Sequence, residues 1–262
     1  MQPTRPDQSS RARSGLKFWQ EVREFLRFLR QPVLAARLSG RVGSTSWSAD
    51  WLSGLRLGRL FQWAILLWVV NLFVFGPIAV AVAGFSGSGH RLDINNLPWM
   101  TALFWAPIVE ELAFRYGLRR PIQALWFVPF MLLAVVMGVQ GWTVGWVGAG
   151  LLIAWWGLKH IHTSSTLAWR RWYRYRFNVA FYMSALAFAA MHWNNFVLGS
   201  LSWWLMPLLV LPQFVTGLVL GWVRVSRGIG AAIVLHALFN AGPILIVGAL
   251  IALNPEGLQA LN

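Results

Sequence analysis

The chain has no cysteine and few charged residues. Of its 262 residues, 57% are hydrophobic and 11% are charged, and 18 are tryptophans. The absence of cysteine excludes disulfides, thiolate metal sites and thiol catalysis. A soluble chain of this length needs a larger charged surface. The composition therefore indicates an integral membrane protein.

Acidic residues are the scarcer of the two charge types, with 8 against 22 lysines and arginines and a net charge of +14. In a soluble protein such an excess would suggest nucleic acid as a partner. Here the basic residues flank apolar runs, so membrane topology accounts for the charge. The lipid bilayer is the expected partner, and nucleic acid is not.

Apolar runs predict the membrane-spanning helices. Each is near the ~20 residues that a helix needs to cross the hydrocarbon core. Seven runs are found, at about 60–84, 99–116, 121–139, 142–158, 177–198, 203–223 and 229–253. The predicted fold class is an all-α polytopic transmembrane helix bundle. About seven spans are expected, with a range of six to eight, since Pro77 and Pro243 could kink or split the first and the last.

The basic residues predict how the bundle is oriented. With a cytosolic N-terminus, 20 of the 22 lysines and arginines fall in segments on the cytosolic side. Arg91 lies outside, and Arg115 falls within a span. The positive-inside rule favours this orientation. We expect a multi-pass protein, of the inner (plasma) membrane if the source is bacterial.

The N-terminal region differs from the rest. Residues 15–41 combine apolar residues at helical spacing with interspersed lysine and arginine, which predicts a basic amphipathic helix. Such a helix could lie on an anionic membrane surface or pack on the cytosolic face of the bundle. The domain prediction is a basic cytosolic or interfacial region over 1–57, a transmembrane domain over 58–254 and a short tail over 255–262.

Two adjacent carboxylates, Glu110 and Glu111, lie within the second apolar run. One charged residue at a helix centre costs ~2.5–3.5 kcal/mol on insertion scales, so two need an explanation. Glu111 precedes Arg115 by four residues, which favours an ion pair on one helix face. Glu110 points about 100° away. It needs a partner on another helix, a proton, or water.

Polar residues in two other runs are the candidate partners. His192 lies in the fifth run, and His236 and Asn240 lie one helical turn apart in the last. Singly, an intramembrane histidine or asparagine often makes only an interhelical hydrogen bond. The carboxylate pair alone could equally form a proton relay or an ion site. Together, they place ionisable groups on three helices of one small protein.

These segments resemble the CPBP family, the CAAX-protease and bacteriocin-processing membrane proteins also called Abi, which are related to the Ras-converting CAAX prenyl endopeptidases. The family's pattern is Glu-Glu-x-x-x-Arg, Phe-x-x-x-His and His-x-x-x-Asn. It is complete and in order here, with Phe188 beginning the second motif. The resemblance covers about 100–245. One departure is an apparent extra hairpin at 121–158.

The resemblance implies an intramembrane glutamic endopeptidase acting on a membrane-associated protein or peptide. In it, Glu110 and His192 activate a water, and His236 with Asn240 stabilises the oxyanion. Glu111 and Arg115 have a supporting role, and no cofactor is implied. The predicted depths of these residues in the membrane disagree. Counted from the cytosolic side, His192 lies 16 residues from Arg176, whereas Glu110 lies only nine from the nearest cytosolic arginine. Either the fifth helix extends into the cytosol, through 166–176, or these groups do not meet.

Two alternatives to a glutamic protease remain. Glu110, His192 and His236 could bind zinc in a metalloprotease, because one carboxylate and two imidazoles are a legitimate catalytic zinc set. The sequence has no His-Glu-x-x-His motif. The second alternative is a non-catalytic membrane protein, namely an immunity or scaffold factor or a proton-coupled transporter, since such residues also suit proton pathways.

Overall fold

A computed structural model describes residues 17–34, 50–51, 55–91, 98–160, 167–200 and 202–253. The main helices are α2 (Phe18–Arg30), α4 (Leu57–Val70), α5 (Gly76–Ser86), α6 (Ala106–Phe114), α7 (Pro121–Met137), α8 (Gly141–His160), α9 (Leu167–Tyr175), α10 (Phe177–Met191), α11 (Met206–Leu209), α12 (Leu211–Ser226) and α13 (Ile229–Leu253). Short helical turns are η1 (Asn71–Phe75), η3 (Thr101–Trp105), η4 (Tyr116–Leu118), η6 (His192–Asn195) and η7 (Trp203–Leu205). Strand β1 (Gly89–His90) pairs antiparallel with β2 (Phe196–Val197). The predicted all-α class is confirmed.

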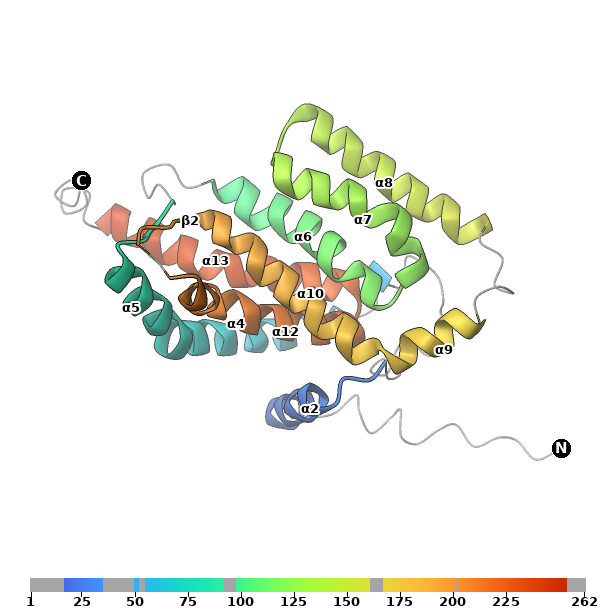
Figure 1. Cartoon of the computed structure of the whole chain (residues 1–262), viewed down its shortest axis with the longest axis horizontal. Helices are drawn as coiled ribbons and strands as arrows, with labels where there is room; N and C mark the ends of the chain where they lie inside the picture. Colours follow the sequence, from blue (N-terminus) through green and yellow to red (C-terminus); the bar gives the residue numbers. More distant parts are fainter. Residues whose placement is uncertain are drawn as a thin grey trace.

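The centre of the bundle is formed by α6, α10, α12 and α13. Helix α13 packs on α4, α6 and α12, and α10 packs on α12 (Figure 1). The largest hydrophobic cluster lies among α2, α4, α10, α12 and α13, and includes Trp63, Phe181 and Trp222. This packing brings the helices of all three sequence motifs together.

The hairpin predicted over 121–158 is present. Helices α7 and α8 pack against each other at one edge of the molecule, and α7 also packs on α6 (Figure 1). Helix α7 ends at Met137, and the next residue, Gly138, has a φ of 69°, a conformation that a residue without Cβ adopts readily. The hairpin thus lies beside α6 rather than between α6 and α10.

Neither of the two prolines singled out in the sequence splits its helix. Before Pro77 the backbone widens into the π turn η1, in which Gly76 N–H donates to Asn71 O. Such a turn relieves the clash of a proline ring with the preceding turn of helix. Helical structure therefore continues over Leu57–Ser86. Pro243 lies within the uninterrupted α13.

Length and hydropathy identify fewer spans than the sequence predicted. Among the described residues, Leu57–Ser86 and Ile229–Ala249 are long and apolar enough to cross a membrane. A third span results if Trp203–Leu209 and Leu211–Ser226 act as one, with a 52° bend between them. Other apolar helices, such as Pro121–Met137, are shorter. Seven spans therefore stay a prediction.

Helix α2 is shorter than the predicted helix over 15–41. It ends at Arg30, and Pro32 follows after one residue. Proline disfavours helical conformation in the residue before it and has no N–H to continue the helix. Residues 15–16 and 35–41 of the prediction lie outside the described part of the chain.

Helix α2 packs against the bundle through both apolar and ionic contacts. The Phe25 ring lies edge-on to the Trp63 indole of α4, with 5.5 Å between centroids. Glu21 is buried, and its carboxylate contacts Arg227 at 2.6 Å and Arg59 at 3.1 Å. Of the two placements left open by the sequence, these contacts favour packing on the bundle.

A second buried carboxylate joins the N-terminal region to the end of α12. Asp50 contacts Arg224 at 2.7 Å and Arg120 at 3.3 Å. The Arg224 guanidinium also donates to the carbonyls of Arg115 and Tyr116, each at 3.2 Å. Asp50 therefore helps to hold the end of α6 against α12, a role that its position in the sequence did not predict.

Candidate active site

Glu111 connects α6 to α13. Its side chain is fully buried, and its Oε1 accepts hydrogen bonds from Arg115 at 2.7 Å and from His236 Nδ1 at 2.9 Å. The contact with Arg115 is the one predicted from the spacing of the two residues. The contact with His236 was not predicted, because sequence reasoning assigned the interhelical partner to Glu110 instead.

Glu110 lies on another face of α6 and is 18% exposed. Its Oε2 is 3.8 Å from His236 Nε2, which is longer than a hydrogen bond. Within the described part of the chain, this buried oxygen has no hydrogen-bond partner. A buried carboxylate oxygen without a partner is unfavourable unless a water or a ligand reaches it.

His236 lies between the two carboxylates. Because Nδ1 is 2.9 Å from a Glu111 carboxylate oxygen, which can only accept, Nδ1 carries a hydrogen. In the neutral ring Nε2 is then an acceptor, and only the imidazolium donates from both nitrogens. The two carboxylates provide the counter-charge for such an imidazolium.

His192 is oriented by the backbone of its own helix. It follows α10, and its Nδ1 lies 2.8 Å from Phe188 O. Since a carbonyl oxygen accepts, Nδ1 is the donor and Nε2 remains an acceptor in the neutral ring. In this tautomer, the Nε2 atom of His192 is the nitrogen that can receive a proton.

The Phe188 ring packs among the charged and polar groups. It lies 3.7 Å from the Arg115 guanidinium carbon, 4.6 Å from the His192 ring and 5.7 Å from the His236 ring. Gly217 of α12 makes this packing possible, because a Cβ there would lie 3.2 Å from Phe188 and 3.3 Å from Arg115. A guanidinium over an aromatic face is a favourable contact. Phe188 therefore acts by packing.

Asn240 has a structural partner. Its Nδ2 donates to Ala102 O at 2.8 Å. Pro107 follows the π turn η3 and has no N–H, so the carbonyl five residues earlier lacks a backbone donor. Asn240 supplies that donor. Its amide nitrogen carries a second hydrogen, which remains for other partners.

The structure brings His192 and Glu110 to one cavity. Residues Leu167–Tyr175 are helical, but they form the separate helix α9, with a break at Arg176 before α10 begins. The helical extension predicted over 166–176 is thus present over 167–175 but interrupted at Arg176, and 166 lies outside the described residues. His192 and Glu110 nevertheless line the same cavity.

This cavity has a volume of about 370 Å³ and lies among α6, α10, α12 and α13. All four of the predicted catalytic residues, Glu110, His192, His236 and Asn240, line it. Sequence reasoning missed other polar residues that share its wall: Thr101, Asn195, Gln213 and Thr216. Gln213 and Thr216 lie three residues apart in the apolar helix α12, and two such polar residues could have indicated from the sequence that this helix lines the site. Gln213 Oε1 is buried and, as far as the structure describes the chain, has no hydrogen-bond partner.

The described residues contain no cluster of three or more His, Asp or Glu side chains that could hold a metal ion. Glu110, His192 and His236 share the cavity without forming such a cluster. The zinc alternative therefore gains no support from the side-chain geometry.

The family model for type II CAAX prenyl endopeptidase Rce1-like proteins matches residues 94–242, which is more than half of the chain. The match includes all three sequence motifs. The chain belongs to this family. It is thus a member of a CAAX-type protease family, and its long apolar helices agree with an integral membrane protein. No curated protein and no solved structure matches the chain.

The CAAX prenyl endopeptidase match begins after α2, α4 and α5. Glu21 and Asp50 therefore lie outside the matched region, although both contact arginines inside it. The α7–α8 hairpin lies inside the match. Helix α2 thus packs on the matched region from outside it.

Proposed function

We propose that the cavity around Glu110 is the active site of an intramembrane endopeptidase, which hydrolyses a peptide bond of a membrane-associated protein or peptide. The observation that carries the proposal is Glu110, which lines the cavity and whose buried Oε2 has no hydrogen-bond partner among the described residues. Histidines on two other helices line the same cavity. Membership in a protease family supports the reaction class.

Glu110 and His192 have the chemistry to activate a water. Glu110 Oε2 and His192 Nε2 are both acceptors, so a water donating to both directs a lone pair toward a bound carbonyl. Glu110 takes the proton as the water oxygen adds to the carbonyl carbon. When the C–N bond breaks, that proton passes to the leaving amine nitrogen.

His236 and Asn240 donate hydrogen bonds to the oxyanion. Asn240 keeps one amide hydrogen beyond its bond to Ala102 O. His236 serves in this role as the imidazolium, whose Nδ1–H is held by Glu111. Donors fixed in a water-poor cavity stabilise developing negative charge strongly. Glu111 and Arg115 act as positioning residues, because they orient His236 and Phe188.

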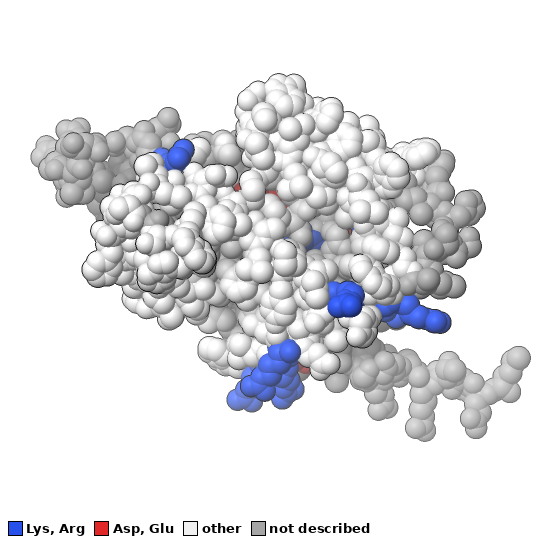
Figure 2. Space-filling view, viewed as in Figure 1, with Lys and Arg blue, Asp and Glu red and all other residues white. Residues whose placement is uncertain are grey.

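We further propose the seven-span arrangement with a cytosolic N-terminus, in a bacterial inner membrane if the source is bacterial. On the face shown in Figure 2, most of the visible cationic side chains gather at the side of the molecule where α2 and α9 lie. That distribution agrees with the positive-inside rule. The domain division at 57 and 254 belongs to the same proposal.

Glu110→Ala tests the mechanism. The substrate is first identified by mass spectrometry of new peptide termini in membranes with and without the protein. Because Glu110 is the general base, we expect cleavage to fall by about 10²–10⁴-fold, with the amount of folded protein unchanged. Glu24→Ala, in α2 and away from the cavity, is the matched control.

Unchanged cleavage in Glu110→Ala would exclude the glutamate mechanism. If instead a chelator abolishes cleavage and added zinc restores it, the reaction is metal-dependent. Absence of new termini in any membrane fraction would favour the non-catalytic alternative.

A further inference from the structure

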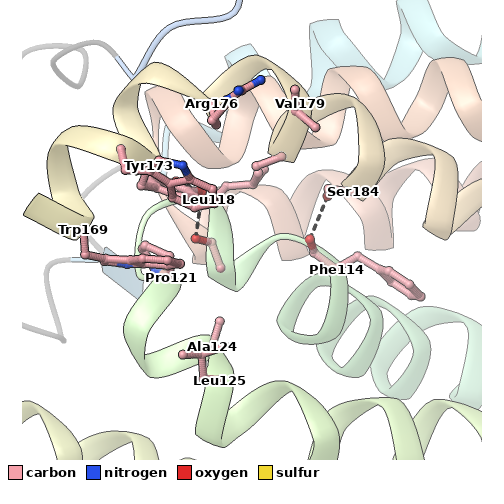
Figure 3. Close-up of a pocket in the computed structure, with 13 residues that line it drawn as sticks. Phe114, Leu118, Pro121, Ala124, Leu125, Trp169, Tyr173, Arg176, Val179 and Ser184 are labelled. Carbon is pink, nitrogen blue, oxygen red and sulfur yellow. Dashed lines mark hydrogen bonds between the residues drawn. The ribbon is translucent and has the colours of Figure 1, made fainter.

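A second and larger cavity lies on the other side of Phe114, away from Glu110. It has a volume of about 580 Å³ and forms a groove between α9 and α10 on one side and η4 and α7 on the other (Figure 3). Phe114 lines it, and the Phe114 ring is 5.8 Å from the ring of Phe188, a residue that lines the active-site cavity. The walls of the two cavities are therefore in contact.

The walls of this groove are apolar, and its edge is open. Leu125 and Val179, on opposite sides, are 67% and 49% exposed. Trp169 and Trp172 of α9 stack with 4.9 Å between centroids, and both line the groove. Such a volume is in the range of small-molecule sites, and its apolar walls suit a hydrocarbon chain.

Some of the polar groups in the groove already have partners. Tyr173 donates to the carbonyls of Gly117 and Leu118 at 3.1 and 3.2 Å (Figure 3). Burial raises the pKa of Tyr173 to about 12, so the hydroxyl keeps its hydrogen. Ser184 donates to Phe114 O at 2.7 Å. These three contacts join the two sides of the groove.

Two polar groups remain for a ligand. Trp169 Nε1 is buried and, within the described part of the chain, has no hydrogen-bond partner. Arg176 lines the groove, and its side chain is exposed. The thirteen lining residues include no aspartate or glutamate. The head of a ligand at the rim meets the positive charge of Arg176, while its body meets apolar walls that include Trp169.

We propose that this groove binds an anionic phospholipid. One acyl chain lies between α7 and α10, and the phosphate oxygens accept hydrogen bonds from Arg176 at the rim. Basic pockets between membrane helices on the cytoplasmic side are suited to anionic headgroups, and the predicted cytosolic position of α9 agrees with this. The charge of the rim selects an anionic lipid over a zwitterionic one.

The test uses the full-length protein in nanodiscs of equal parts phosphatidylglycerol and phosphatidylcholine, with retained lipids counted by native mass spectrometry after detergent release. Ala124→Trp fills the groove, and Val136→Trp, exposed on the same helix and outside the groove, is its control. Arg176→Gln removes the rim charge, and Arg174→Gln, which does not line the groove, is its control.

We expect the unchanged protein to retain one phosphatidylglycerol in preference to phosphatidylcholine. Ala124→Trp should lose it, and Arg176→Gln should lower the preference about fivefold, the effect of one cation near a membrane surface. Both controls and Glu110→Ala should retain the lipid, so failure of the catalytic proposal leaves this one testable.

Two results would overturn the proposal. The first is equal retention of both lipids by the unchanged protein. The second is unaltered retention of phosphatidylglycerol by both Ala124→Trp and Arg176→Gln. If Ala124→Trp leaves the lipid in place and instead blocks cleavage of a lipid-modified peptide, the groove holds part of the substrate.

Discussion

Arg115 contacts both the carboxylate that orients His236 and the ring that packs on both histidines. Its guanidinium lies 2.7 Å from Glu111 and 3.7 Å from the Phe188 ring centroid, and it is fully buried. A buried charge is tolerated when it is paired, and loss of one partner leaves the other uncompensated. The geometry of the histidines thus depends on a cation that reaches no reacting atom.

Arg115→Ala should therefore destabilise the protein by about 3–5 kcal/mol, the usual cost of breaking a buried pair. Glu111→Gln should also destabilise it, because Arg115 then lacks its counter-charge. Thermal unfolding in detergent and the yield of monodisperse protein measure both. Arg115→Lys, which keeps the charge, should lose less. Normal stability with abolished turnover would show instead that the pair takes part in the reaction.

At the scale of elements, the N-terminal helix is joined to the bundle by charge as well as by packing. Glu21 and Asp50 are each buried among arginines, and Arg227 and Arg224 lie at the end of α12. Buried carboxylates need such pairing, since desolvation is costly for an unpaired charge. Helix α2 therefore belongs to the folded unit.

Glu21→Gln and Arg227→Gln should each lower the unfolding temperature, because each removes one side of the buried Glu21–Arg227 ion pair. The double variant should be less destabilised than the sum of the two, since the same lost ion pair is counted in both single variants. A double-mutant cycle in thermal unfolding measures this coupling. Glu24→Gln in the same helix is the control and should change little. Additive effects would mean that the two side chains do not interact.

The orientation of the whole molecule in the membrane can be tested directly, because the chain has no cysteine and single cysteines can be introduced as reporters. Arg174 in α9 and Ser202 before η7 are both exposed, and the topology places them on opposite sides. In intact cells, an impermeant thiol reagent should label Ser202→Cys, whereas Arg174→Cys should react only after permeabilisation. Both should react equally in detergent. The reverse pattern would place the N-terminus outside.

The sequence alone determined the family, the helical class and the set of candidate residues. These follow from local properties, since hydropathy and motif spacing depend on near neighbours in the chain. The Glu111–Arg115 contact was equally predictable, because four residues complete about one helical turn. The charges of Glu21 and Asp50 were visible, but their burial was not.

Only the tertiary structure decided which groups from different helices meet. It brought His236 to Glu111 as well as near Glu110, placed His192 in the same cavity despite its distance along the chain, and engaged Asn240 with Ala102 O. The physical reason is that helix packing sets rotation and offset between helices through contacts such as Gly217 against Phe188, which no periodicity encodes. The π turn before Pro107 further shifts α6 relative to an ideal helix.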